Sequence, residues 1–163
     1  MKYIINQKIF SIGDKFVIKD EYGSERYFVE GKVFSLGDKL KIYDSNGQER
    51  IYIEQKLFKL LPEYYLYFDG NFAAKVKQAF SLLRPKFQIE SPFGSYSVEG
   101  DFFGYDFRIM KNSRLVAHVS KKFFSFRDSY GVDIVNDEND LLILAVVIVI
   151  DQVIHDEDHH RNH

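Results

Sequence analysis

Two aspartates in the middle of the chain are the first candidates for acid and base chemistry. Asp101 and Asp106 bracket a Phe-Phe-Gly-Tyr segment, and paired carboxylates can act as general acid and base when one of them is desolvated. Aspartate and glycine also connect strands, so we interpret both aspartates as turn residues. The chain contains no Gly-rich phosphate loop, nucleophile elbow or HExxH zinc motif. We therefore expect a protein that is not an enzyme.

The five histidines offer a second kind of chemistry. His118 stands alone among apolar residues, and we expect a histidine satisfied by its neighbours in a barrel rather than a general base. His155 and His159 are spaced for one face of a helix, where they could hold a divalent metal together with Asp158. The alternative is that these His and Asp residues belong to a solvent-exposed chain end, which is the usual explanation for such a polar terminal segment. We therefore predict neither a metal site nor a cofactor.

Basic side chains gather in the middle of the sequence and suggest an anion-binding surface. Residues 55–127 carry 12 basic and 6 acidic side chains, whereas residues 128–163 carry 1 and 9. If the strands of the two most basic segments are neighbours, their outward side chains would attract acidic lipid head groups. The alternative is that lysine and arginine only keep the outer face of a sheet soluble. The candidate residues for lipid binding are Lys75, Lys77, Arg84, Lys86, Lys121 and Lys122.

The composition narrows the class of protein further. The chain has 163 residues, which fits a single domain, and we place that domain at residues 1–157 with a short polar, His-rich tail at 158–163. The absence of cysteine excludes disulfides, thiol catalysis and Cys-ligated zinc. A pI of about 6.2 argues against nucleic acid as a partner. The N-terminus lacks the pattern of a secretory signal, so we expect a cytoplasmic protein, in contact with membranes only at their surface.

A repeat of 24 residues predicts how the chain folds. Residues 10–29 align without a gap to residues 34–53, with 10 identities in 20. Each copy contains two extended runs around a Gly-containing turn, so one copy corresponds to one β-hairpin. Similar hairpin patterns continue to about residue 135, and counting them gives roughly twelve strands. The 16 Phe and 11 Tyr also favour a β protein.

The last long apolar run has a different pattern. Leu141–Ile150 is apolar throughout and follows an acidic segment, as is typical of a helix N-terminus. A helix that is apolar on every face must be surrounded by apolar groups. Ten residues are too few to cross a bilayer, which needs about 17–25. A buried strand stays an alternative, but we favour a helix that fills a closed antiparallel barrel of about twelve strands.

Several segments carry a resemblance to a known family: the doubled Phe-Ser-(Ile/Leu)-Gly-Asp-Lys motif, Glu99–Phe102, Val119–Phe123 with Tyr130–Val132, and the ending Leu144–Gln152. In these segments the sequence resembles the LOR family of the tubby C-terminal-like superfamily. This resemblance implies a mainly β fold, a twelve-stranded barrel with a hydrophobic C-terminal helix through its centre. For function, the superfamily suggests only an association with phosphoinositides or anionic membrane surfaces.

Together these observations predict a non-enzymatic binding or scaffold module. The first hypothesis is peripheral association with anionic phospholipid or phosphoinositide head groups through the basic residues named above. The alternative is a protein interaction module that uses exposed aromatic loops at Pro92–Gly94 and Phe102–Gly104.

Overall fold

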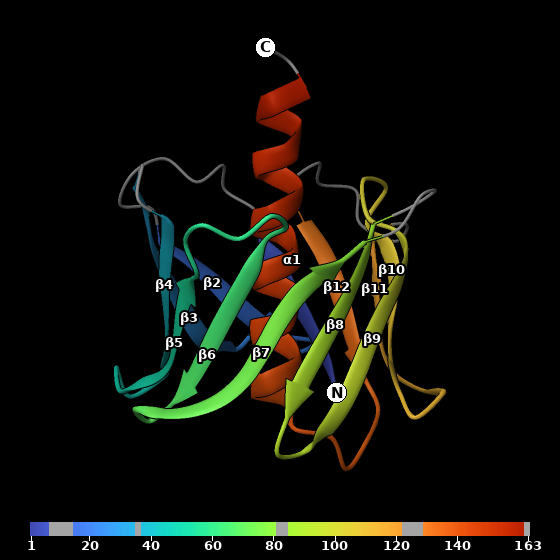
Figure 1. The fold of residues 1–163 in the computed structure, drawn as a ribbon. Coiled ribbons are helices and arrows are strands. Elements are labelled where there is room, and N and C mark those ends of the chain that lie inside the picture. Colours follow the sequence, from blue (N-terminus) through green and yellow to red (C-terminus); the bar gives the residue numbers. More distant parts are fainter. Residues whose placement is uncertain (7–14, 35–36, 81–84, 122–128, 162–163) are drawn as a thin grey trace.

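The computed structural model describes residues 1–6, 15–34, 37–80, 85–121 and 129–161, without the side chains of 32–34 and 158–161. Twelve antiparallel strands form a closed barrel around one helix (Figure 1). This confirms the fold predicted from the repeat and the apolar run. The strands are β1 (Lys2–Asn6), β2 (Lys15–Asp20), β3 (Glu25–Phe34), β4 (Gly37–Asp44), β5 (Glu49–Gln55), β6 (Glu63–Phe68), β7 (Asn71–Ala79), β8 (Lys86–Ser91), β9 (Gly94–Asp101), β10 (Asp106–Lys111), β11 (Arg114–Ser120) and β12 (Ser129–Ile134).

The strands follow one another around the barrel in the order of the sequence. Each strand pairs with the next, and β1 pairs with β12 to close the sheet. The closure is reinforced at the N-terminus, where the Met1 ammonium donates a hydrogen bond of 2.6 Å to the Ile134 carbonyl. Because a closed sheet has no edge strands, all its backbone groups can pair within the barrel.

The 24-residue repeat corresponds to two hairpins with the same turn chemistry. Asp20 at the end of β2 and Asp44 at the end of β4 each accept hydrogen bonds from the backbone N–H groups two and four residues further along. Arg26 lies 3.6 Å from Asp20, and Arg50 lies 3.8 Å from Asp44. The repeated Asp and Arg therefore stabilise equivalent turns.

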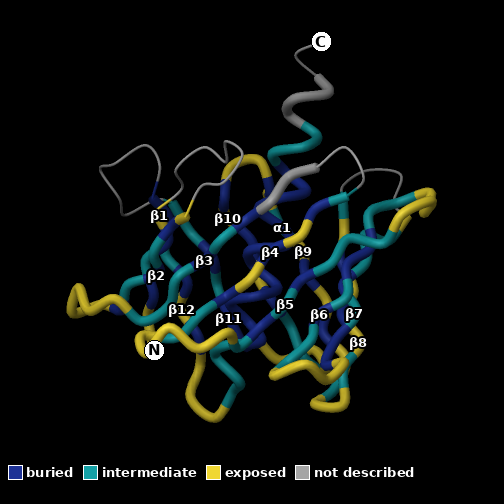
Figure 2. The backbone as a smooth tube through the Cα atoms, turned by 90° about the vertical axis from the view of Figure 1, so that its left-hand side faces the viewer, coloured by how far each residue is buried: buried dark blue, intermediate teal, exposed yellow. Residues whose placement is uncertain are grey.

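Helix α1 (Asp140–Arg161) fills the barrel. Every side chain from Leu142 to Ile154 is buried, and the inward-facing apolar residues of the strands pack around them. Figure 2 colours the chain by how far each residue is buried. The helix begins where the Asn139 Oδ1 accepts a hydrogen bond of 3.1 Å from the Leu142 N–H. It continues well past Ile150, so residues 158–161, which we predicted as part of a tail, have a helical backbone.

One end of the barrel, which we call the exit end, is where α1 leaves the barrel (top of Figure 1). The loop between β5 and β6 and the end of β7 also lie at this end (Figure 1). No helix among the described residues is long and apolar enough to cross a membrane.

Candidate functional site

The predicted basic residues on β7 and β8 are mostly engaged with acidic neighbours. The Lys75 Nζ lies 3.1 Å from a Glu63 oxygen, and the Lys77 Nζ lies 4.0 Å from a Glu90 oxygen. Lys86 begins β8 and is exposed. Arg84 lies outside the described residues. The Lys77–Glu90 pair is exposed and contributes little to stability, whereas Glu63 is buried beside Lys75. Both pairs reduce the positive potential of the face.

The second basic segment lies on another part of the barrel. Lys121 follows β11, and its Nζ lies 4.2 Å from the centroid of the Tyr105 ring. Three strands, β8, β9 and β10, stand between β7 and β11 in the sheet. Lys122 is outside the described residues. The first basic segment, residues 71–89, reaches β8, and the second, residues 107–127, begins in β10. Strand β9 stands between them, so the condition that strands of the two segments be neighbours is not met.

The candidate acid and base residues lie on the outer surface. The His118 Nε2 is 2.7 Å from the Asp106 Oδ1, so this histidine has a hydrogen-bond partner, as predicted. The Asp101 Oδ1 accepts a hydrogen bond of 3.0 Å from the Gly104 N–H, which is the predicted turn role. Both aspartates are exposed. Neither carboxylate is desolvated, as one member of an acid and base pair would have to be.

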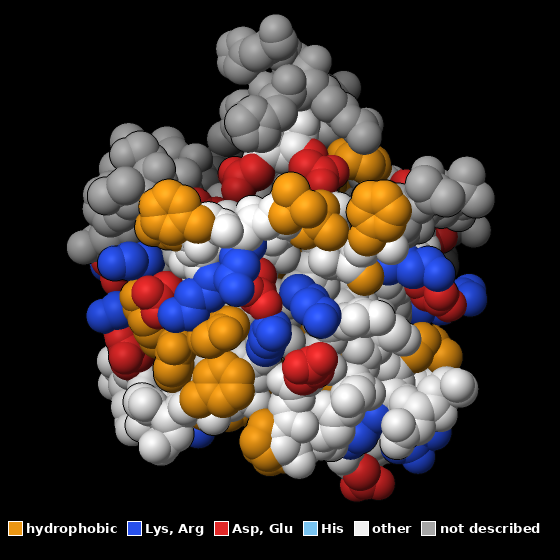
Figure 3. All heavy atoms as spheres, viewed as in Figure 1, with side chains coloured by type: hydrophobic (Ala, Val, Ile, Leu, Met, Phe, Trp, Pro, Cys, Tyr) orange, Lys and Arg blue, Asp and Glu red, His pale blue; other side chains and the backbone are white. Residues whose placement is uncertain are grey.

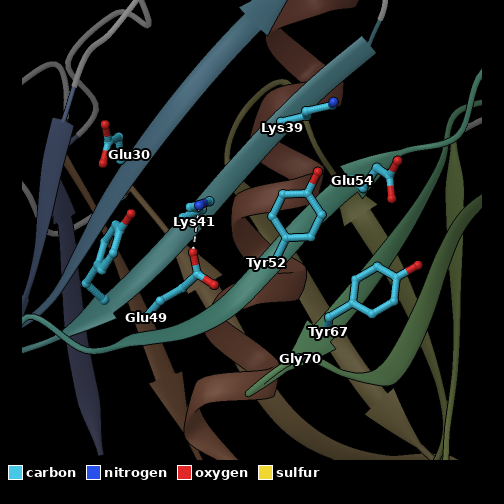
Figure 4. Close-up of a pocket in the computed structure, with 9 residues that line it drawn as sticks. Glu30, Lys39, Lys41, Glu49, Tyr52, Glu54, Tyr67 and Gly70 are labelled. Carbon is cyan, nitrogen blue, oxygen red and sulfur yellow. Dashed lines mark ion pairs between the residues drawn. The ribbon is translucent and has the colours of Figure 1, made fainter.

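A shallow hollow of about 590 Å³ lies on the outer face of β3, β4, β5 and β6 (Figure 4). Tyr52 and Tyr67 form part of its wall, with ring centroids 5.9 Å apart. Two lysines and three glutamates also line it, and Lys41 and Glu49 pair at 2.9 Å. The excess of carboxylates opposes an anionic ligand here, so this hollow does not support the predicted lipid head-group site. The lining residues are Glu30, Lys39, Lys41, Tyr43, Glu49, Tyr52, Glu54, Tyr67 and Gly70.

Four exposed apolar side chains lie at the exit end, and together we call them the apolar crest: Leu57, Phe58, Leu60 and Phe80. The first three belong to the loop between β5 and β6, and Phe80 follows β7. Phe58 and Leu60 are fully exposed at 103% and 99%, and Phe80 is 79% exposed. The Gln78 N–H donates a hydrogen bond of 3.0 Å to the Pro62 carbonyl, which holds the loop beside the end of β7.

Exposure of the apolar crest lowers the stability of the folded chain. Phe58 has a φ of 61°, in the left-handed region that side chains other than glycine rarely adopt. Exposed side chains of this size lose the stabilisation that burial would give them, which is about 1.5–3 kcal/mol each. Several large apolar side chains exposed at one end of a folded protein therefore indicate an interaction surface.

Lysines lie directly below the apolar crest. Figure 3 shows hydrophobic side chains along the upper edge of the face formed by β6, β7 and β8, with a group of Lys and Arg side chains beneath them. Lys56 is the first residue of the loop, and its Nζ lies 4.5 Å from the centroid of the Tyr65 ring. Lys59 lies within the loop, 3.2 Å from Glu63. We call Lys56, Lys59, Lys75 and Lys77 the crest lysines.

The prediction of an exposed aromatic loop at Phe102–Gly104 is wrong for Phe102. This side chain is only 2% exposed, and its ring packs against Phe87 and Phe107 with centroid distances of 5.2 and 5.1 Å. The turn bends Phe102 into the barrel, so only Phe103 faces solvent. In the other predicted loop, Phe93 is 49% exposed.

A buried polar cluster joins α1 to the barrel at the exit end. Asp38, at the start of β4, is 4% exposed, and its carboxyl group is hydrogen-bonded to that of Asp156 on α1. The Tyr64 hydroxyl donates a hydrogen bond of 2.9 Å to the Asp38 Oδ2. Burial is the main cause that raises the pKa of both carboxyl groups, that of Asp156 to about 7. At neutral pH the two groups therefore share a proton for part of the time.

His155 and His159, the two histidines that could share a helical face for metal binding, cannot both be located in the structure. The His155 Nε2 lies 3.8 Å from the Asp151 Oδ1, whereas the side chains of Asp158 and His159 are not described. Within the described part of the chain, no group of three or more His, Cys, Asp or Glu side chains is arranged to hold a metal ion.

The sequence reasoning missed both the apolar crest and the buried carboxyl pair. The crest has a signal in the sequence, because Lys56–Leu61 is rich in apolar residues, ends at Pro62 and lies between two strands. An apolar run in a connection has no core to enter. The carboxyl pair has no comparable signal, because Asp38 and Asp156 are far apart in the chain and only the threaded helix brings them together.

Comparisons with known proteins agree with this architecture. The family model described as LURP-one-related (LOR) matches residues 1–151. The uncharacterized protein YxjI of Bacillus subtilis is 35% identical over 158 residues, which cover 97% of this chain and 96% of that protein. The X-ray structure of an Arabidopsis thaliana protein has the same fold, with a TM-score of 0.67, 17% identity, and coverage of 93% of this chain and 90% of that one. The chain therefore belongs to the LURP-one-related family.

Proposed function

We propose that this LURP-one-related protein is a non-enzymatic binding module that docks on anionic membrane surfaces with the exit end of its barrel. The observation that carries the proposal is the apolar crest beside the crest lysines. Apolar side chains that enter the interface, together with basic side chains at head-group level, are the two features that bind peripheral proteins to acidic membranes.

The magnitudes favour insertion of the crest over electrostatic attraction alone. Transfer of Phe58, Leu60 and Phe80 out of water would contribute roughly 5–9 kcal/mol before the cost of immobilising the protein. A basic residue near an anionic surface contributes about 1 kcal/mol. Glu54, Glu63 and Glu90 offset part of this attraction, because they pair with all four crest lysines. We therefore expect binding that weakens in salt but is not abolished by it.

The shape of the crest also suits a membrane better than a folded partner. Phe58 and Leu60 project from a loop and are fully exposed, so they have few contacts with their own chain. The energetic centre of a protein interface needs a matching pocket on the partner, whereas a fluid acyl interface adapts to any protrusion. The interior of the barrel is filled by α1, which supports a role for the outer surface rather than for an enclosed substrate site.

The test uses the absence of tryptophan from the chain. A Phe58→Trp variant carries a single tryptophan in the crest, and a Tyr22→Trp variant carries one in the exposed turn between β2 and β3. With vesicles that contain equal parts of phosphatidylcholine and phosphatidylglycerol, we expect a blue shift of the fluorescence for the crest tryptophan only. The control tryptophan should be unaffected, because its turn lies at the other end of the barrel (Figure 2).

Flotation of the same vesicles completes the test. The protein should float with the mixed vesicles and much less with pure phosphatidylcholine. A Phe58→Asp and Leu60→Asp double variant should stay at the bottom of the gradient, whereas Tyr22→Asp should float. Failure of the unmodified protein to float at low salt would refute the proposal. Flotation of the double variant together with the unmodified protein would refute the role of the crest and favour attraction by lysines alone.

A further inference from the structure

One row of side chains crosses the outer face of the barrel and passes through the hollow on β3, β4, β5 and β6. Each member of the row lies directly opposite the next one on the neighbouring strand, from β3 to β7. The row consists of Glu30, Lys41, Tyr52, Tyr67 and Phe72. Neighbouring strands are about 4.8 Å apart, so the row presents one side chain at each regular step across the sheet.

The aromatic members of the row form a continuous strip. The rings of Tyr52 and Tyr67 lie side by side (Figure 4), with centroids 5.9 Å apart and an angle of 34° between their planes. Phe72 packs edge-on against Tyr67 at 6.0 Å and against Tyr65 at 5.3 Å, so it supports the Tyr67 ring from the side of β7. Tyr52 and Tyr67 are only half-buried. They therefore offer a ligand a flat apolar face beside a polar hydroxyl group.

The charged residues around the two rings supply hydrogen-bond donors and acceptors without a dominant charge. Lys41 pairs with Glu49 at 2.9 Å, and Glu54 lies 3.7 Å from Lys56. Lys39 and Glu54 are directly opposite each other on β4 and β5, one step along the strands from the row. A strongly anionic ligand would meet the three carboxylates of the hollow, and a strongly cationic one would meet its two ammonium groups. The hollow therefore fits a neutral ligand that both donates and accepts hydrogen bonds.

We infer that this hollow binds a neutral, linear oligosaccharide. One face of a pyranose ring consists of C–H groups that pack on an aromatic ring, and its hydroxyl groups donate to carboxylates and accept from ammonium groups. The advance of a linear glycan per sugar is comparable with the spacing between strands, so successive sugar rings lie over Tyr52 and Tyr67. The volume of about 590 Å³ is within the range of about 300–1,000 Å³ for small-ligand sites.

A proline-rich peptide is another kind of ligand that docks on aromatic grooves. Its prolines have no N–H group, so they cannot donate to the carboxylates of Glu30 and Glu54, whereas the hydroxyl groups of a glycan can. The hollow contains no residue of the apolar crest, so the inference does not depend on membrane docking.

Isothermal titration calorimetry of the whole chain with cellotetraose, maltotetraose and chitotetraose tests the inference. We expect one of these glycans to bind, with an affinity that salt changes little because the ligand is neutral. Tyr52→Ala and Tyr67→Ala should each weaken binding about tenfold or more, because each removes a stacking face. Tyr67→Phe keeps the ring and should retain most of the affinity. Tyr22→Ala, which removes an exposed tyrosine outside the hollow, should bind like the unmodified protein.

A tryptophan reporter gives a second readout. Because the chain has no tryptophan, Tyr67→Trp places a single indole in the hollow, and its fluorescence should change over the glycan concentrations that saturate the calorimetric signal. The fluorescence of Tyr22→Trp should stay constant.

Three results would overturn the inference. The first is that none of the glycans binds at millimolar concentration. The second is that Tyr52→Ala and Tyr67→Ala bind as the unmodified protein does, because the glycan would then lie elsewhere. The third is that a polyproline peptide or spermidine binds in place of the glycans and is lost in the same two variants, because the hollow would then serve a different class of ligand.

Discussion

A single substitution in the middle of α1 tests the central feature of the fold. Ile148 is fully buried, with the wall of the barrel around it. In Ile148→Asp, the loss of the apolar side chain costs about 2–3 kcal/mol, at the low end for large-to-small changes because the carboxyl group fills part of the space. To be buried uncharged at pH 7, the new carboxyl group must also be protonated about three pH units above its usual pKa, which costs roughly 4 kcal/mol.

The cost of the lost packing and the cost of protonation together are comparable with the whole free energy of unfolding of a domain, which is about 5–15 kcal/mol. Each kcal/mol corresponds to about 2–4 °C in the melting temperature of a chain of this size. We therefore expect Ile148→Asp to melt at least 12 °C below the unmodified protein at pH 7, or to be unfolded, taking about 6 kcal/mol and 2 °C per kcal/mol. At pH 4 the cost of protonation is absent, so the deficit relative to the unmodified protein at the same pH should shrink by more than half.

Two control variants distinguish burial in the barrel from a general effect of the substitution. Val135→Asp places the same charge at a residue that is 38% exposed and should change the melting temperature little. Ile148→Val removes one methylene group and should cost about 0.5–1.5 kcal/mol, so it reports on packing even if the Asp variant does not fold. An Ile148→Asp variant that melts with the unmodified protein, or whose deficit is the same at pH 4 and pH 7, would refute the threaded helix.

Two further predictions concern the carboxyl pair and a glycine. The pKa of Asp156 is raised in the folded protein from 3.8 to about 7, so this group contributes stability at low pH that is lost as the pH rises through that window. The free energy of unfolding of Asp156→Asn should therefore rise relative to that of the unmodified protein as the pH increases from 5 to 8, by on the order of 1–2 kcal/mol after solvent screening. Metal-free urea titrations measure this difference, and a difference that does not change with pH would contradict the raised pKa. Gly100 has a φ of 139°, and a Cβ there would lie 2.6 Å from the Asp106 carbonyl oxygen, so Gly100→Ala should cost about 3 kcal/mol or more in thermal unfolding. Gly47→Ala has the positive φ without the clash and should cost only about 1–2 kcal/mol; equal losses would contradict the close approach at Gly100.

The features of the fold that depend on local patterns could be predicted from the sequence. The repeat determines hairpins because Asp20 and Asp44 occupy the same position in two copies, and each can form its turn without help from distant residues. The helix could be predicted because a run that is apolar on every face has few environments available. The barrel then follows from many hairpins and one segment that needs complete burial.

The candidate surfaces could not be predicted because they depend on how strands are ordered around the barrel. The charge of the segment that contains Lys75 and Lys77 is visible in the sequence, but its pairing with Glu63 and Glu90 across strands is not. A count of charges along the chain therefore overestimated the positive potential of this face. In the same way, the sequence does not reveal that Phe102 turns inward while Phe103, the next residue, turns outward.

The apolar crest and the carboxyl pair lie at the same end of the barrel, and this position links membrane docking to the protonation of the pair. Tyr64, which donates to Asp38, directly follows the loop that carries the crest. An anionic surface near −30 mV concentrates protons about threefold. A bound proton neutralises one of the carboxylates of Asp38 and Asp156, whose negative charge otherwise opposes the approach of the exit end to acidic lipids. Docking and protonation of the carboxyl pair should therefore reinforce each other, because each lowers the electrostatic cost of the other.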